Sequence, residues 1–496
     1  MQITWGIDAD ARKRGATQPV IWNSQAAVNG HCLLVGMSGA GKTHSLRKMV
    51  REIIASAGRG RAPRFHVFDV HGDIEIGGES AVMFSEQTTY GMNPLRVNPD
   101  PHFGGVRKRV QGFISTVNRV MRQLGPKQEA VLRNILLDVY GHHGFRQDEP
   151  RSWYIDDDAA HQVTNGDPRR LYLDVPKGEK DQLKDLKIGA QWDDRLFCWW
   201  IPPEQYQGAV TRWPPATLAR THPSITDAVR YARYRLQMSF LGSGIDAITN
   251  LEIANRAASA YQRKLLEALR KGDKGFEDEK LQADIEKAKQ RAIDSYADYV
   301  TAIATGQELT DLMKYDSTEV LKSVVDRLEN LDAIGIFKSA PPPFDPHSPI
   351  WRYNIRALSM EERKLFVLFR LEEIFAAAVQ RGEQDDIVEV VILDEAHIYA
   401  DDDPDNIINS IAKEARKFGL ALICASQSPT HFPEDFIASV ATKIILGIDE
   451  SYWRGSATKL RVAEESLAWI KMQKSMLVQL KTKGETKNEW RAVLID

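Results

Sequence analysis

The sequence is poor in cysteine, and this excludes two classes of small stabilised protein. Three cysteines occur among 496 residues, Cys32, Cys198 and Cys424, and none has a CxxC or Cys/His spacing. A disulfide framework and a zinc site of recognisable spacing are therefore excluded. Because Cys32 and Cys424 stand within apolar runs, we interpret them as small buried side chains in a reducing compartment.

Long apolar runs and net charge are also lacking. No stretch approaches the roughly 20 apolar residues that a bilayer crossing needs, and the amino terminus has no apolar signal-peptide core. We therefore expect a cytoplasmic protein without membrane contact. With 65 basic and 68 acidic residues the net charge is -3. This excludes a uniformly positive surface but leaves room for a locally basic channel that binds nucleic acid.

What the sequence does contain is a complete phosphate-binding loop. Residues 36–43 read Gly-Met-Ser-Gly-Ala-Gly-Lys-Thr and match G-x-x-x-x-G-K-[ST]. The loop follows an apolar strand expected at 32–35 and opens a helix expected at about 43–57, whose apolar residues recur at helical spacing. Backbone N–H groups of such a loop surround phosphate oxygens at a helix N-terminus. The pattern therefore predicts a site for ATP.

Roles within the loop follow from its chemistry. Lys42 is expected to reach the β- and γ-phosphates and so to take part in catalysis, while the Thr43 hydroxyl ligates Mg²⁺. The nucleotide contacts are assigned to Gly36, Ser38, Gly39, Ala40, Gly41, Lys42, Thr43 and His44.

A pair of acids follows the most apolar strand expected in the chain, at about 388–394. Hydrolysis needs a carboxylate for Mg²⁺ and a base for the attacking water, and we assign these roles to Asp394 and Glu395. A capping acid after a strand is the alternative. Residues 394–397 spell Asp-Glu-Ala-His, yet a superfamily 2 helicase is disfavoured. Lys42 lies about 350 residues earlier, and the Ser-Ala-Thr strand of those helicases is missing.

Two polar residues flank the next expected strand, at 420–425. Gln427 follows it and is a candidate to sense the γ-phosphate and position water, or simply a capping residue. Arg416 precedes it and is a candidate arginine finger that acts on a neighbouring subunit's nucleotide. The alternative for Arg416 is a cation favoured by a helix C-terminus.

Strand–helix–strand order predicts an α/β fold with a mostly parallel central sheet. The middle of the chain differs, with a Trp/Pro-rich stretch at 199–203 and a charged run at about 263–299 that we interpret as a solvated helical hairpin or coiled coil. The expected parts are a β-hairpin or lid segment (1–30), the first half of an ATPase core (31–145), a large, mainly helical insertion (146–310), and a second core half with acidic motif, sensor and C-terminal strands (311–496).

Together these motifs resemble the HerA branch of the HerA/FtsK superfamily. The resemblance rests on the phosphate loop and on 68–73 (Phe-Asp-Val-His-Gly-Asp), 393–397 and 416–429, and covers roughly 30–145 and 310–480. It implies a RecA-like P-loop core and a homohexameric ring, with ATP sites at subunit boundaries and an arginine supplied in trans. It also implies double-stranded DNA in the pore and a nuclease or other effector subunit encoded nearby, in anti-phage defence or DNA end processing.

Two questions stay open at this level. Candidates for a basic pore are Arg107, Lys108, Arg109, Arg119, Arg122 and Lys127, although a solvated helix face accounts for each. Family members usually dock their partner through an N-terminal β-barrel, and about 30 residues precede the core here, so the insertion is a candidate for that task. The alternative to a translocase is an ATP-binding hexameric scaffold that assembles and regulates an effector.

Overall fold

The computed structural model describes residues 1–57, 62–155, 169–193, 198–213, 216, 221–240, 244–271, 276–303, 308–485 and 488–495. The chain forms two compact units. The sheet unit comprises residues 1–94, 115–122 and 334–496, and the insertion unit comprises 95–114 and 123–333. Sequence analysis set the insertion at 146–310, whereas the unit extends from 95 to 333 apart from 115–122. The helices α4 (Pro126–His142) and α10 (Thr318–Ala333), which flank 146–310, pack on each other and on α6 (Ile225–Phe240).

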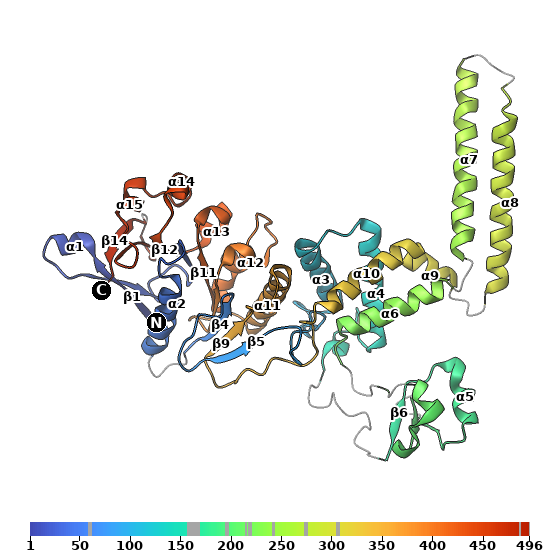
Figure 1. The fold of residues 1–496 in the computed structure, drawn as a ribbon, viewed down its shortest axis with the longest axis horizontal. Coiled ribbons are helices and arrows are strands. Elements are labelled where there is room, and N and C mark those ends of the chain that lie inside the picture. Colours follow the sequence, from blue (N-terminus) through green and yellow to red (C-terminus); the bar gives the residue numbers. More distant parts are fainter. Residues whose placement is uncertain are drawn as a thin grey trace. The chain divides into compact units, whose positions relative to one another are not determined.

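One eleven-stranded sheet forms the centre of the sheet unit (Figure 1). In spatial order its strands are β2 (Pro19–Asn23), β1 (Gln2–Asp8), β14 (Trp490–Leu494), β13 (Ser475–Leu480), β12 (Thr442–Gly447), β3 (Cys32–Gly36), β11 (Leu420–Ser426), β10 (Glu389–Leu393), β4 (Arg64–Asp69), β9 (Ile350–Asn354) and β5 (Ser80–Met83). Neighbours from β12 to β5 are parallel, and those from β12 to β2 are antiparallel. The expected α/β class with a mostly parallel sheet is confirmed.

Helices cover both faces of the parallel strands. The helices of the sheet unit are α1 (Ala9–Lys13), α2 (Lys42–Ser56), α11 (Met360–Arg381), α12 (Ile407–Glu414), α13 (Glu434–Ser439), α14 (Trp453–Leu460) and α15 (Glu464–Trp469), while α3 (Val106–Val120) has residues in both units. Along β4, Phe65 and Val67 belong to the core that contains the apolar side of α2. Phe68 points to the opposite face and contacts Phe366 of α11. This burial on both faces explains why the strands are almost continuously apolar in sequence.

Residues 1–30, set apart by sequence analysis as a hairpin or lid segment, form a hairpin that continues the sheet. β1 pairs with both β2 and β14. Trp5 and Trp22 are buried in the same core as α2, so burial of these rings holds the hairpin in the sheet. Strands β5 and β9 were not expected, because Trp351, Arg352 and the exposed Met83 break the apolar pattern that marks the other strands.

The insertion unit combines helices with a small sheet. Its helices are α4 (Pro126–His142), α5 (Lys180–Asp185), α6 (Ile225–Phe240), α7 (Gly244–Arg270), α8 (Glu279–Ala302), α9 (Glu308–Tyr315) and α10 (Thr318–Ala333), and its sheet has the order β6 (Leu171–Leu173), β8 (Cys198–Ile201), β7 (Gln191–Asp193). The charged run expected to form a helical hairpin does so, as α7 and α8. The small sheet was unexpected, and packs Leu173, Ile201 and Trp213 into a core of its own.

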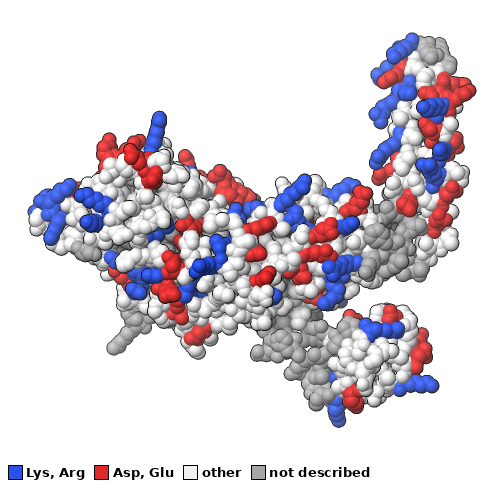
Figure 2. All heavy atoms as spheres, in the orientation of Figure 1, with Lys and Arg blue, Asp and Glu red and all other residues white. Residues whose placement is uncertain are grey.

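The surface agrees with the balanced composition. Figure 2 shows basic and acidic side chains interspersed over the visible face. Within the described residues, no helix has the length and apolar character that crossing a membrane would require.

Candidate nucleotide and magnesium site

The phosphate loop connects the buried strand β3 to the fifteen-residue helix α2. Gly39 and Gly41 have φ values of 79° and 97°, in the left-handed region that glycine adopts without strain. α2 begins at Lys42 directly after Gly41, so the free N–H groups of its first turn lie at the loop. A concave row of N–H groups at the positive end of a helix binds anions. The backbone here therefore fits the phosphate group that the sequence predicts.

Side chains of the loop lie as its chemistry requires. Lys42 Nζ donates a hydrogen bond to the Gly36 carbonyl oxygen at 2.8 Å and lies 3.8 Å from Glu395 Oε1. A Cβ atom on Gly36 would lie only 3.1 Å from the Ala40 Cβ. Ser38 and His44 are exposed on the loop and on the first turn of α2. The loop thus places its one lysine beside Glu395, the second residue after β10.

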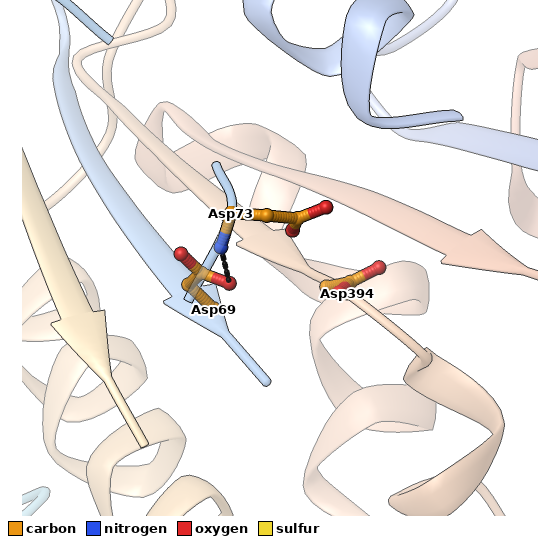
Figure 3. A group of neighbouring side chains, drawn as sticks. All are labelled: Asp69, Asp73 and Asp394. Carbon is orange, nitrogen blue, oxygen red and sulfur yellow. Dashed lines mark hydrogen bonds between the residues drawn. The ribbon is translucent and has the colours of Figure 1, made fainter. Parts of the chain in front are cut away.

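Three carboxylates meet at the carboxyl ends of β4 and β10, from Asp69, Asp73 and Asp394 (Figure 3). One oxygen from each lies within 4.8 Å of the others. The parallel register pairs Leu393 with Phe68, which brings the acids after both strands to the same sheet edge. Thr43 Oγ1 lies 3.5 Å from Asp73 Oδ2, so the loop hydroxyl borders the cluster. Hydroxyl and carboxylate oxygens are ligands that suit Mg²⁺.

The three acids differ in what else they bind. Asp69 accepts hydrogen bonds from the backbone N–H of Gly72 at 2.7 Å and of Ile74 at 3.0 Å, and pairs with Arg352 at 3.1 Å. It therefore fixes the turn that carries Asp73. Sequence analysis used this segment for the resemblance but gave Asp69, Asp73 and Arg352 no role. An acid at each end of a turn after a buried strand was the available signal for the first two.

Asp394 is a buried acid with an altered affinity for protons. Its side chain is almost fully inaccessible. Burial, and after it the neighbouring Glu395 carboxylate, raises the pKa of Asp394 to about 6. A nearby divalent cation would reverse this effect, because it favours the ionised form. The cluster is therefore electrostatically costly by itself and suited to a cation.

This cost predicts that Asp394→Asn stabilises the protein at high pH. The pKa of Asp394 is higher in the folded chain than its ordinary 3.8, so its favourable contribution is complete below pH 3.8 and is lost as pH rises through 6. A neutral side chain of the same shape removes that loss. Thermal unfolding without Mg²⁺ should show a gain on the order of 1 to 3 kcal/mol at pH 8 and none below pH 4. Asp385→Asn, at an exposed position, is the control. An equal gain in stability of Asp394→Asn at both pH values would contradict the burial argument.

Glu395 has a strained backbone at the centre of the site. Its φ of 46° is unusual for a residue with a side chain. This conformation turns the chain from β10 into a short 3₁₀ turn at Ala396–Ile398. Its Oε1 lies 3.9 Å from His71 Nε2 and its Oε2 lies 3.3 Å from His397 Nδ1, yet the buried Oε2 has no hydrogen-bond partner. A strained backbone and a buried oxygen without a hydrogen bond are features of functional residues.

Gln427 and Arg416 lie at opposite ends of β11. Ser426 pairs with Val35, so Gln427 is exposed at the edge that carries the phosphate loop. Arg416 precedes β11 in a 3₁₀ turn, near the buried His31, whose pKa burial and then Arg416 lower to about 4. Because the seven residues of β11 span roughly 20 Å, Arg416 does not join the cluster of its own chain.

Gln473 contacts the phosphate loop, and sequence analysis missed this residue. Its Nε2 donates to the Gly39 carbonyl oxygen at 2.9 Å, and its φ is 62°. It lies between α15 and β13, and no sequence pattern marks it.

The expected basic residues are not equivalent. Arg119 pairs with Asp401, at 3.5 Å, and with Asp403. Arg107 is exposed and donates to Gln147 at 3.0 Å. Arg119 is therefore engaged within the fold, whereas Arg107 and its neighbour Lys108 are exposed.

Comparisons with known proteins agree with this geometry. The family described as "Helicase HerA, central domain" matches residues 12–145, and a "Domain of unknown function (DUF5710)" matches 170–215. The "DNA double-strand break repair helicase HerA" of Pyrococcus furiosus is 44% identical over 63 residues, which are 12% of this chain and 11% of the relative. VirB4 of Thermoanaerobacter pseudethanolicus aligns with a TM-score of 0.55 and 13% identity over 100% of this chain and 96% of its own. That likeness shows a shared fold.

Proposed function

We propose that the chain is a HerA-like P-loop ATPase, because residues 12–145 match the HerA central domain, and that it hydrolyses ATP with Mg²⁺ to move double-stranded DNA. The observation that carries the proposal is the meeting of Lys42, the three carboxylates and the strained Glu395 at one sheet edge. DNA-stimulated ATP hydrolysis tests it. Hydrolysis that does not respond to DNA would favour the scaffold function instead.

Binding is assigned to the loop and to the carboxylate cluster. The N–H groups at the start of α2 hold phosphate oxygens, and Lys42 leaves the Gly36 carbonyl to neutralise them. Thr43 and Asp394 would hold Mg²⁺, with Asp73 near enough to contribute. When bound, the cation lowers the energy of negative charge on the transferred phosphoryl group.

Glu395 is assigned the role of general base. Its Oε2 makes no hydrogen bond in the folded chain and is able to accept a proton from water, and Lys42 Nζ lies 3.8 Å from its Oε1. Gln427 lies at the same edge on the next strand and is assigned to orient that water. A glutamine suits this task because it forms hydrogen bonds without titrating.

Arg416 is assigned to the ATP of a neighbouring subunit. Its place at the far end of β11 leaves it unable to reach the phosphate loop of its own chain. A head-to-tail ring would bring the two edges of adjacent copies together, and a homohexamer is the form that we propose. The finger would then stabilise charge in the transition state.

Subunit mixing tests this assignment. Arg416→Ala alone and Lys42→Ala alone should both be nearly inactive, but an equal mixture should regain activity. Roughly a quarter of its interfaces join an intact loop to an intact arginine. Lys417→Ala, the adjacent exposed cation, is the control and should remain active. A mixture no more active than its components would contradict an arginine acting in trans.

DNA binding is proposed to depend on phosphate contacts and to lack sequence preference. The affinity should therefore fall steeply with salt, by about 10³-fold between 50 and 200 mM if six phosphates are contacted. Arg107→Ala with Lys108→Ala should reduce the slope of log affinity against log salt without changing basal ATPase activity. The exposed Lys13 of α1 provides the control substitution. An unchanged slope would assign the contacts to other residues.

A nuclease or other effector encoded nearby is the proposed partner, in DNA end processing or anti-phage defence. Similarity over 63 residues to a DNA double-strand break repair helicase of Pyrococcus furiosus favours DNA end processing. Co-purification of the untagged neighbouring gene product with the tagged chain tests this proposal, and failure to associate would oppose it.

A further inference from the structure

The α7–α8 hairpin of the insertion unit is an antiparallel coiled coil with one buried seam. On α8 the buried side chains recur at spacings of four, three and four residues, at Ala288, Ala292, Ser295 and Tyr299. Two hydrogen bonds across the seam fix its register, from Asn250 Nδ2 to Ser295 Oγ at 3.1 Å and from Gln282 Nε2 to Tyr261 OH at 3.0 Å. Alternating spacings of three and four are the signature of paired helices.

A second row with the same spacing lies on the outside of α8. Ile293, Tyr296 and Val300 of α8, and Ile303 directly after the helix, follow one another at three, four and three residues and are 60%, 54%, 48% and 47% exposed. Three of them lie one position beyond a residue of the buried seam. The row therefore has the pattern of a helix–helix contact, and it is exposed in the part of the chain that the structure describes.

α7 contributes to the same face. A groove between the two helices is lined on α7 by Leu251, Glu252, Ala254, Asn255 and Ala258 and on α8 by Lys289. Ile293 lies one turn beyond Lys289, so the outer row of α8 borders this groove. Leu269 lies five full turns beyond Leu251 on α7, so the two side chains are on the same side of that helix. The apolar face has two groups of side chains, each close to half exposed or more: Leu251, Ile293, Tyr296, Val300 and Ile303 in one, and Leu266 and Leu269 about 22 Å farther along α7 in the other.

The side of the hairpin that carries the apolar face is large enough for a stable contact. The 24 residues of α8 extend about 36 Å, and two helices side by side are about 20 Å wide. The product, roughly 700 Å², is the area of that whole side, polar side chains included, and approaches the about 800 Å² per partner of a standard protein interface.

Charges along the edges of the apolar face indicate which partner fits. Arg263 and Arg270 lie about one turn on either side of Leu266, along the outer edge of α7. Glu279 and Glu286 precede Ile293 by fourteen and seven residues, which puts them in its row along α8. All four are exposed. In Figure 2 basic side chains lie mostly along one edge of the hairpin and acidic ones mostly along the other.

A second hairpin turned by 180° about the long axis would match both features. Its α8 would lie against α7 of the first copy, so that acidic edge meets basic edge twice while the apolar faces meet in the middle. We propose that the apolar face binds the same face of a second copy of this chain, with the two hairpins parallel in a four-helix bundle. Such a contact is closed after two copies. It pairs chains without nucleotide and does not depend on the ATPase ring.

Cysteine cross-linking of the full chain tests the predicted neighbours. The two seam hydrogen bonds set Leu251 level with Ile293, so in the pair each faces the other residue of the opposite copy. Chains with Leu251→Cys are mixed with chains with Ile293→Cys, both with Cys198→Ser, since Cys32 and Cys424 are buried. Mild oxidation should link the mixture at least about fivefold more than either chain alone. Ile253→Cys, equally apolar and exposed on the other side of α7, is the matched control.

Charge reversal tests the edges independently. Arg263→Glu with Arg270→Glu in one chain, and Glu279→Arg with Glu286→Arg in another, should each weaken self-association at least about tenfold in sedimentation without nucleotide. Their mixture should associate again, because each reversed edge then meets its opposite. Nucleotide binding should remain in every variant, which shows that the chain is folded.

Three outcomes would overturn the proposal. The first is a wild-type chain that stays monomeric at high micromolar concentration without nucleotide. The second is a failure of the charge-reversed chains to associate with each other while each still binds nucleotide. The third is cross-linking of Leu251→Cys alone to the same extent as the mixture, which requires a different packing of the hairpins. In the first case an effector or another part of the chain covers the face.

Discussion

Lys42→Ala is expected to lower kcat/KM for ATP by at least about 10²-fold, since it removes a charged group that contacts the transferring phosphoryl group. Lys42 leads α2, and its Nζ lies between the Gly36 carbonyl oxygen and Glu395. Alanine keeps the helix, because it is the best helix former. The loss should therefore arise from missing charge. Steady-state hydrolysis and ATP-binding titration together measure it.

Lys48→Ala is the matched control for this experiment. Lys48 lies on the same helix and forms a partly exposed pair with Glu52 at 3.7 Å. Surface pairs of this kind contribute little to stability, so both ATP binding and hydrolysis should be retained. If Lys42→Ala hydrolysed ATP at the rate of Lys48→Ala, the loop would not be the catalytic site.

Glu395→Gln is expected to lower kcat by about 10²- to 10⁴-fold, the usual contribution of a general base, while ATP remains bound. The two side chains have the same shape, so the left-handed turn at 395 and the contact region of Lys42 are kept. Glutamine cannot accept the proton of the attacking water. Single-turnover hydrolysis separates this chemical step from binding.

The contrast between the two substitutions is informative. Lys42→Ala should weaken ATP binding as well as turnover, whereas Glu395→Gln should affect turnover alone. Glu383→Gln changes an exposed acid in the loop before β10 and should leave both unchanged. Normal turnover of Glu395→Gln would move the role of base to another group, and Asp73 would be the first to examine because it borders Thr43.

Local sequence was sufficient to predict the loop, the acidic strand end and the fold class. Residues 36–43 specify their own geometry, because positive φ values need glycine and a helix N-terminus needs no distant partner to bind an anion. Asp394 and Glu395 followed a strand recognisable by its apolar run. The charged hairpin was predictable for the same reason, since helical spacing is a local property.

Tertiary structure alone decided which of these local pieces meet. The register of β4, β10, β11 and β3 brings Asp69 and Asp73 to Asp394, and it separates Arg416 from its own loop, because parallel strands align all their carboxyl ends at one edge. Gln473 reaches Gly39 across more than 400 residues of sequence, a contact that no local pattern encodes. Likewise, helical spacing predicted a hairpin, but only the packing of α7 on α8 showed which apolar residues are used in the seam and which remain exposed.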